Sequence, residues 1–423
     1  MKEIILKNKE KISFISLLIF SIYPIFIMIL NYLNSNLIST MWVEINYLLG
    51  VLGFLLLCLS INKEKIKNYK KEIILLSILS ILIFISTLLS SNKTISILGS
   101  MYRNDGLIMY INYFFIFTLG HNIKNDKYKK IILTGVIITS LILGFLTGFD
   151  ITSNNVFSLS TYPYLFYNYN HLGYYLTIGV ISSLILFINE ENKFKNVFYL
   201  LSNILLTINI ILNNTFGSYL GVLCGITFML IINIIRKEKI LKTVFSVLIF
   251  LLLSLLLSYK ATPIVLDNFK ALVSDTKNII TTDDIKDKSI SKSGNRLELW
   301  TNAIDFIKEK PLFGYGIENL SEKYKSVGVL EDRPHSSILQ IALFLGIPAL
   351  LLISSLILKI FIANVFNIKK ESLINIGILT IFIAYTISSL FGNSMYYTTP
   401  YYMIILGFLY KKRESIPLMV DSQ

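Results

Sequence analysis

Residues 12–33, ISFISLLIFSIYPIFIMILNYL, form a predominantly apolar run without a charged side chain. About 20 such residues, coiled as an α-helix, cross the hydrocarbon core of a bilayer. The preceding segment, Met1–Lys11, is basic, but the run is too long for a signal-peptide core and no small-residue cleavage site follows it. We therefore expect an uncleaved first transmembrane helix.

The same pattern recurs along the chain. Of its 423 residues, 54% are hydrophobic and only 15% are charged, whereas soluble domains carry about a quarter charged residues. Because a backbone inside a bilayer must satisfy its own hydrogen bonds, each run predicts a helix. The expected fold class is an all-α polytopic membrane protein with about 12 transmembrane helices. The apolar runs lie at about 12–33, 41–61, 73–89, 107–120, 131–148, 171–188, 197–213, 216–235, 243–259, 338–358, 373–391 and 400–410.

The distribution of Lys and Arg predicts the side that each connection faces. With a cytoplasmic N-terminus, the inner connections carry most of the 39 Lys and Arg residues, as the positive-inside rule requires. We therefore expect a multi-pass protein of the cytoplasmic membrane with both termini cytoplasmic. The chain then divides into helices 1–9 (residues 1–259), a large extracytoplasmic loop (260–337) and helices 10–12 (338–423).

Other features exclude several classes of protein. Cys58 and Cys224 both fall within apolar runs, where neither a disulfide nor a metal site is indicated. The sequence contains no nucleic-acid-binding motif, and the membrane topology explains the net charge of +13. We therefore expect no nucleic acid among the partners.

The arginines carry a sharper signal, because the chain has 34 lysines but only five arginines. Arg103, Arg296 and Arg333 all lie in segments predicted to be outside. A guanidinium group binds phosphate oxygens at two points and stays charged when partly buried. We therefore predict that the three bind an anionic ligand, such as a diphosphate, at the outer interface. Alternatively, each pairs with the acid nearest to it in the sequence: Asp105, Glu298 and Asp332.

The three histidines are too few and too scattered for a metal site, and none is predicted. His335 stands beside Arg333 at the expected start of a helix. A neighbouring cation favours the neutral imidazole, which can take a proton from a hydroxyl group. Helix capping or packing is the alternative role. His171 begins another helix on the outer side, directly after the segment 168–170, and this N-terminal position suits contact with an anion. Asn168, Asn170 and His171 are therefore candidate substrate-binding residues.

Within the large loop, Leu297–Lys310 has apolar residues at helical spacing and should pack on the membrane helices. Pro311 ends this helix and Gly314–Gly316 makes a turn. A second short helix is expected at about 317–325.

Several segments resemble motifs of the O-antigen ligase/polymerase superfamily, in the form found in Gram-positive members. The run Arg333–Gly346, RPHSSILQIALFLG, is similar to the family pattern of His-Asn, Leu-Gln and Glu-x-Gly, although Ser336 and Phe344 replace the Asn and the Glu. Further similar segments are Arg296–Gly316 (Arg-x-x-x-Trp and Pro-x-x-Gly-x-Gly), Phe166–His171 (Gly-Asn-x-Asn), Gly99–Gly106 (an outer loop) and Thr215–Gly221 (Thr-x-Ser-Arg-Gly, without the arginine).

The resemblance implies a GT-C-like membrane glycosyltransferase. Such an enzyme transfers a glycan from an undecaprenyl-diphosphate carrier to a glycan, lipid or cell-wall acceptor on the outer face of the cytoplasmic membrane. It further implies that His335 activates the acceptor hydroxyl, that Arg296 and Arg333 bind the diphosphate, and that no metal or other cofactor is needed. Arg103 is the candidate substitute for the arginine missing near Thr215.

Three alternatives remain open. A polymerase that extends lipid-linked repeat units shares the same motifs and differs from a ligase in product length. A flippase or exporter of lipid-linked glycans would need ionisable residues along a path through the membrane, and almost none are present. A non-catalytic scaffold of the cell envelope is the third.

Overall fold

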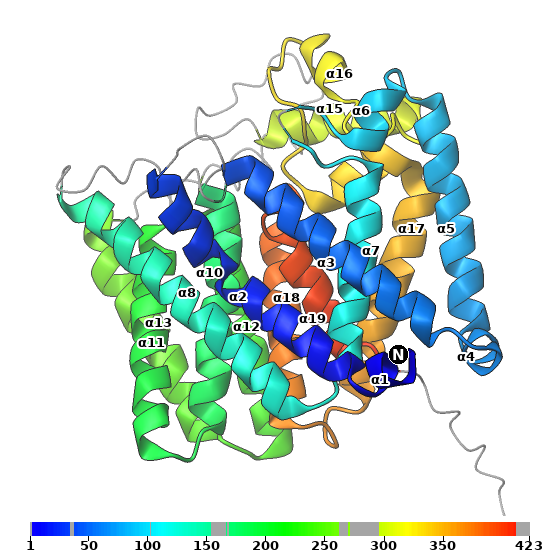
Figure 1. Cartoon of the computed structure of the whole chain (residues 1–423). Coiled ribbons are helices and arrows are strands. Elements are labelled where there is room, and N and C mark those ends of the chain that lie inside the picture. Colours follow the sequence, from blue (N-terminus) through cyan, green and yellow to red (C-terminus); the bar gives the residue numbers. More distant parts are fainter. Residues whose placement is uncertain are drawn as a thin grey trace, which may run out of the picture.

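The computed structural model describes residues 2–33, 38–101, 103–153, 166, 169–261, 270 and 296–411. These residues form helices and connections, with no strand among them (Figure 1). The helices are α1 (Lys2–Lys7), α2 (Lys9–Leu33), α3 (Ile38–Ser60), α4 (Lys63–Asn68), α5 (Lys70–Leu89), α6 (Lys93–Leu98), α7 (Leu107–Asn122), α8 (Asp126–Ser153), α10 (Tyr169–Asn189), α11 (Lys193–Leu212), α12 (Phe216–Arg236), α13 (Ile240–Ala261), α15 (Arg296–Glu309), α16 (Ser321–Lys325), α17 (Ser337–Phe366), α18 (Leu373–Ser389) and α19 (Thr399–Leu409).

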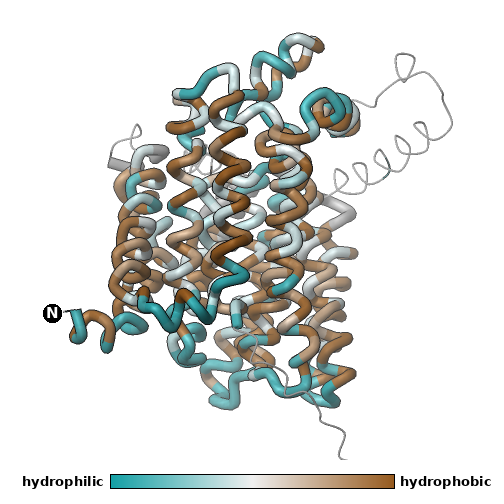
Figure 2. The backbone as a smooth tube through the Cα atoms, turned by 90° about the vertical axis from the view of Figure 1, so that its right-hand side faces the viewer, coloured by the Kyte–Doolittle hydropathy of each residue, from teal (hydrophilic) through white to brown (hydrophobic). Residues whose placement is uncertain are grey.

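Each of the twelve predicted apolar runs overlaps one of these helices, which confirms the all-α class. Within the described ranges, nine helices are long and apolar enough to cross a membrane, and α18 and α19 are shorter apolar helices. Figure 2 shows hydrophobic residues along the helices and hydrophilic residues at both ends of the bundle. The chain is thus a multi-pass membrane protein, while the count of twelve spans stays a prediction.

Helix α10 is the centre of the bundle. Every side chain from His171 to Ile188 is buried, because α8, α11, α12 and α18 surround the helix. By contrast, most side chains of α5 and α13 are not buried, and many large apolar ones are exposed. Exposed apolar surface of this extent is unfavourable in water, so we expect lipid to cover these two helices.

The two ends of the bundle differ in their short helices and in their charged residues. Helices α1 and α4 lie at one end, and α6, α15 and α16 lie at the opposite end (Figure 1). At the α1 end, the carboxylate of Glu10 accepts hydrogen bonds from the backbone N–H groups of Lys124 and Asn125. Lys411 forms an ion pair with Glu371, just before α18. The α15 end holds Arg103, Arg296, Arg333 and His335.

Helix α17 is broken at Gly346, whose φ of 85° and ψ of 168° are non-helical. The Pro311–Gly316 segment lies against the break. Tyr315 and Gly316 donate backbone hydrogen bonds of 2.8 and 3.0 Å to the carbonyls of Leu343 and Phe344, and Ile347 donates one of 2.8 Å to Pro311. Irregular backbone at membrane depth is tolerated where protein groups satisfy it, and this segment does so.

The lobe formed by α15, α16 and their connections matches the expected elements only in part. Helix α15 confirms the helix predicted at 297–310, and its buried face contributes Leu299 and Phe306 to a core shared with α17. Helix α16 is shorter than predicted, because the chain turns at Glu318, which has a φ of +65°. Residues 262–269 and 271–295 lie outside the described residues, so the boundaries of the predicted loop remain predictions.

Candidate functional site

The segment 390–398, which joins α18 to α19, links the predicted site residues at the α15 end. The ring of Phe391 lies 6.1 Å from that of Trp300, one turn along α15 from Arg296. The amide oxygen of Asn393 accepts a hydrogen bond of 3.0 Å from the backbone N–H of His335. This connecting segment therefore contacts both the helix that begins with Arg296 and the residue predicted to be the base.

Arg333 is buried between two carboxylates. Only 1% of its side chain is exposed, and its Nη2 donates to the carboxylates of Asp105, at 3.1 Å, and Glu318. Its Nη1 donates to the carbonyl of Ser394 at 2.6 Å. Burial alone would lower the pKa of Arg333, but the charges of Glu318 and Asp105 raise it. Both Nη atoms are thus engaged, whereas Nε is buried without a hydrogen-bond partner among the described residues.

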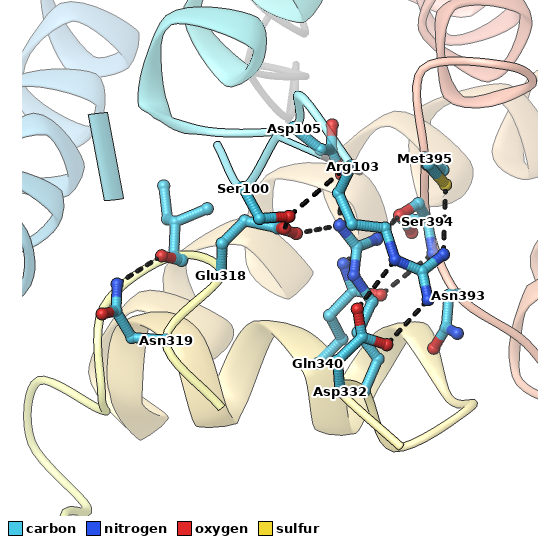
Figure 3. Close-up of polar contacts among 12 residues, drawn as sticks. Ser100, Arg103, Asp105, Glu318, Asn319, Asp332, Gln340, Asn393, Ser394 and Met395 are labelled. Carbon is cyan, nitrogen blue, oxygen red and sulfur yellow. Dashed lines mark hydrogen bonds and ion pairs between the residues drawn. The ribbon is translucent and has the colours of Figure 1, made fainter. Parts of the chain in front are cut away.

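Arg103 forms a two-point ion pair with Asp332. Its Nε and Nη2 donate to the two carboxylate oxygens at 2.8 and 2.7 Å, and its Nη1 lies 3.5 Å from the sulfur of Met395 (Figure 3). Burial would raise the pKa of Asp332, but the hydrogen bonds and charge of Arg103 lower it below its usual value. The partners predicted from sequence proximity are thus exchanged, because Asp332 serves Arg103 while Asp105 serves Arg333.

Arg296 differs from these two arginines. It is partly buried at the start of α15, and no described residue forms an ion pair or hydrogen bond with it. Its pKa is lowered because burial disfavours the charged form, and the nearby hydroxyl of Tyr174 on α10 only partly opposes this. A partly buried cation without a carboxylate partner is costly unless an anion binds there. Arg296 therefore fits an anion-binding role.

Several polar atoms at the same end are buried and have no hydrogen-bond partner among the described residues. The hydroxyl of Tyr174 lies against Gly392, and Gly173 lies against the side chains of Thr215 and Ser218. Such buried groups are normally paired, so their arrangement fits a polar ligand or water. The atoms concerned include Tyr174 Oη, Asn213 Oδ1, Asn214 Oδ1, Ser218 Oγ, Trp300 Nε1 and Arg333 Nε.

His335 does not begin a helix, contrary to the sequence-based expectation. Helix α17 begins at Ser337, and His335 precedes it with a φ of +51°, in the left-handed region that non-glycine residues rarely adopt. Pro334 precedes His335 in the chain, and Asn393 holds its backbone N–H. The imidazole Nε2 lies 3.3 Å from Oε2 of Glu331, and the side chain is 22% exposed. The ring is therefore reachable at the edge of the site.

Gln340 joins the first turns of α17 to the connecting segment. Its amide oxygen accepts a hydrogen bond of 3.0 Å from the backbone of Ser394, and its amide nitrogen donates to the Ser394 carbonyl at 3.3 Å (Figure 3). The Ser394 carbonyl also accepts a hydrogen bond from Arg333, so Gln340, the Gln of the Leu-Gln motif, helps to fix a residue that contacts Arg333.

The predicted substrate-binding residues of α10 are only partly described. His171 is buried with its ring centroid 5.7 Å from those of Tyr174 and Tyr397. It lies close enough to Arg103, Arg333 and His335 for their charges to act on it. Asn170 is partly buried, whereas Asn168 lies outside the described residues. The fold thus brings His171 to the same end as the arginines.

Sequence reasoning names Asp105 only as a possible partner of Arg103, and it misses Glu318 and Glu331. Asp105 and Glu318 enclose Arg333, and Glu331 contacts His335. That acids pair with these arginines could have been predicted, since each of the three arginines has a carboxylate nearby in the sequence. The exchange of partners could not be foreseen, because it depends on how the segments at the α15 end contact one another.

No group of three His, Cys, Asp or Glu side chains that could hold a metal ion occurs within the described ranges. That no metal or other cofactor is needed remains a prediction.

The comparison with known families is specific to one part of the chain. Residues 201–354 match the family model of the O-antigen ligases. This range contains Arg296, Arg333 and His335, whereas Arg103 and His171 precede it. No curated protein matches the chain. The match over residues 201–354, together with the apolar helices, supports membership of the O-antigen ligase/polymerase superfamily.

Proposed function

We propose that this protein transfers a glycan from an undecaprenyl-diphosphate carrier to an acceptor hydroxyl on the outer face of the cytoplasmic membrane. The family match supports a ligase- or polymerase-like membrane glycosyltransferase. The carrier, the acceptor and the residue roles are our inference. The acceptor is a glycan, a lipid or a cell-wall component.

The proposed orientation puts the α1 end in the cytoplasm and the α15 end outside. Lysines gather in the connections of the α1 end, as the positive-inside rule expects. The site would then face the side on which lipid-linked glycans are presented. Both described chain ends, at residues 2 and 411, would lie on the cytoplasmic side.

Arg296 is the residue that we assign to the carrier diphosphate. A guanidinium group aimed at the leaving group stabilises the negative charge that develops there, and such electrostatic stabilisation usually contributes most to catalysis. The absence of an acid partner for Arg296 among the described residues is the single observation that best supports this assignment. The unpaired groups of Tyr174, Ser218 and Trp300 supply further hydrogen bonds for oxygens of the donor.

His335 acts as the general base in this proposal. The acceptor O–H gives its proton to the imidazole while the acceptor oxygen bonds to the anomeric carbon of the donor sugar. The bond from that carbon to the diphosphate oxygen breaks, and its electron pair leaves on undecaprenyl diphosphate. Attack from the face opposite the leaving group inverts the anomeric configuration. The proton then passes from the imidazolium to water.

In this proposal Arg103 and Arg333 have a structural role, whereas the sequence predicts that they bind the diphosphate. Their present carboxylate partners fix the 99–106 loop, Glu318 and Asp332 against one another. We propose that this buried network positions the site. A two-point contact of either guanidinium with the diphosphate would require at least one of its present carboxylate contacts to be exchanged on binding.

The test uses the purified protein in vesicles that contain undecaprenyl-diphosphate glycan, with candidate acceptors added. We expect transfer by the wild type and a loss of roughly 10²–10⁴-fold in rate for His335→Ala, the range typical of a general base. Transfer by His335→Ala at the wild-type rate would remove the base assignment. Chain length of the product separates a ligase from a polymerase, and added EDTA tests the expected metal independence.

A further inference from the structure

Glu331 lies four positions before His335 and is the only residue of the described chain whose side chain contacts the imidazole by a hydrogen bond or ion pair. Its Oε2 is 3.3 Å from Nε2 of the ring. The hydrogen bond from His335 lowers the pKa of Glu331 below its usual value, so the carboxylate is ionised at neutral pH. An ionised carboxylate can only accept a hydrogen bond.

This contact determines which nitrogen carries the proton in the neutral ring. Nε2 must carry it in order to donate to Glu331, which leaves Nδ1 as the acceptor. No described residue makes a hydrogen bond to Nδ1. A ring that is free to rotate would present this atom only part of the time, so the carboxylate contact also improves orientation.

Separate hydrogen bonds hold the backbone around His335. Asn393 accepts the hydrogen bond from the backbone N–H, and Gln340 holds the neighbouring Ser394. These contacts fix the left-handed backbone but do not restrain the side-chain torsions. Glu331 supplies the contact that acts on the ring itself.

The other charged side chains near Glu331 and His335 already form ion pairs with each other's neighbours. Asp332 is bound at two points by Arg103, and Arg333 lies between Asp105 and Glu318. His171 on α10 has its ring beside those of Tyr174 and Tyr397. Glu331 alone among these acids is 46% exposed and directed to the ring, so its carboxylate is available to His335.

We propose that Glu331 is a positioning residue, which holds the imidazole of His335 with the proton on Nε2 so that Nδ1 receives the acceptor proton. This inference rests on the proposed function, because it assumes that His335 is the base. It assigns a role to the residue four positions before the histidine, which the family resemblance leaves unassigned.

The first arm of the test measures glycan transfer by Glu331→Gln, Glu331→Asp and Glu331→Ala in the same vesicles. We expect Glu331→Gln and Glu331→Ala to lower kcat by roughly 10- to 100-fold while KM for the lipid-linked donor stays within about twofold. Glu331→Asp should recover part of kcat, since it keeps the charge. Glu322→Gln is the matched control, because that exposed carboxylate in the same lobe only pairs with Lys325.

The second arm does not depend on transfer. Diethyl pyrocarbonate modifies the unprotonated nitrogen of histidine, and the rate at His335 is followed by mass spectrometry of its peptide. The rates are compared on the high-pH plateau of a pH series, where protonation of the ring no longer limits them. There we expect Glu331→Gln to slow this modification severalfold and Glu322→Gln to leave it unchanged. Equal modification rates in the wild type and Glu331→Gln would overturn the positioning role.

The two arms separate the two ideas. Failure of the wild type to transfer to any acceptor would remove the proposed function, while the labelling would still decide whether Glu331 orients the ring. Normal transfer by Glu331→Gln, in an active wild-type background, would overturn this inference and leave the proposed function intact.

Discussion

Arg103 and Asp332 lie 229 positions apart in the sequence, yet the guanidinium of Arg103 donates two hydrogen bonds to the carboxylate of Asp332. The pair joins the loop before α7 to the segment before α17. It thereby holds Arg333 and His335, which follow Asp332 closely in the chain, against the rest of the α15 end.

Removing one member of this pair should destabilise the protein. Asp332→Ala removes a carboxylate that compensates the charge of the buried Arg103 guanidinium. A buried donor that loses its partner lowers the free energy of unfolding by about 1–3 kcal/mol. The double variant Arg103→Leu with Asp332→Ala should lose less than the two single losses combined. Thermal unfolding in detergent measures both.

The exposed pair Lys308–Asp305 is the control for this cycle, since both side chains are more than half exposed. Its coupling should be about 0.2–1 kcal/mol or less. Equal coupling in the two cycles would show that the Arg103–Asp332 pair has no special role in stability.

Stability should fall as the pH rises through neutrality because of Asp105. Burial is the main cause that raises the pKa of this carboxyl to about 7; Glu318 acts in the same direction, while Arg333 and Tyr113 oppose the rise. A folded-state pKa above the unfolded value means that the folded state binds the proton more tightly. The contribution of Asp105 is thus fully present below about pH 4 and is lost as the pH rises through about 7.

The measurement is the unfolding temperature of the wild type and Asp105→Asn between pH 5 and 8. The asparagine side chain does not titrate in this range, so the unfolding temperature of the variant should change less with pH than that of the wild type. An identical slope in both proteins would assign the pH dependence to other groups.

Arg296→Ala should weaken donor binding more than it changes the fold. Loss of charge-assisted hydrogen bonds to a diphosphate that leaves in the reaction predicts a fall in kcat/KM for the donor of about 10- to 100-fold. Arg296→Lys should restore only part of the affinity, because an ammonium group lacks the planar fork. Lys308→Ala, on the exposed face of the same helix, serves as the control and should keep the wild-type kcat/KM.

Gly346→Ala should disturb α17 more than a comparable substitution elsewhere. A Cβ atom at Gly346 would lie 2.2 Å from the carbonyl oxygen of Leu312, in addition to the strain of a positive φ. Gly328 also has a positive φ, but a Cβ there meets nothing within 4 Å. Gly328→Ala should therefore cost only the backbone strain, about 1–2 kcal/mol.

We expect Gly346→Ala to unfold at a clearly lower temperature than Gly328→Ala, with less protein recovered from the membrane. Similar unfolding temperatures would mean that the Pro311–Gly316 segment can move away from the break without loss.

The helices themselves are predictable from local sequence. Runs such as 12–33 and 171–188 contain enough consecutive apolar residues that only a membrane helix satisfies their backbone, and each overlaps a helix in the structure. The helix at 297–310 is also recognisable, because its apolar residues recur at helical spacing. These features depend on neighbours within a few turns of the same segment.

The candidate site is predictable only as a set of residue types. Arginine is scarce in this chain, which distinguishes Arg103, Arg296 and Arg333 from the many lysines, and His335 stands beside one of them. Which arginine is paired with a carboxylate could not be predicted. That outcome depends on contacts between segments that lie hundreds of residues apart.

The amino-acid sequence by itself determined that this chain is a bundle of membrane helices with a polar lobe, because hydrophobic length and helical spacing are local properties. Only the tertiary structure decided that Asp332 binds Arg103, that Asp105 and Glu318 bind Arg333, and that Arg296 has no acid partner among the described residues. Side chains of opposite charge pair according to distance in space and burial, and folding sets both quantities.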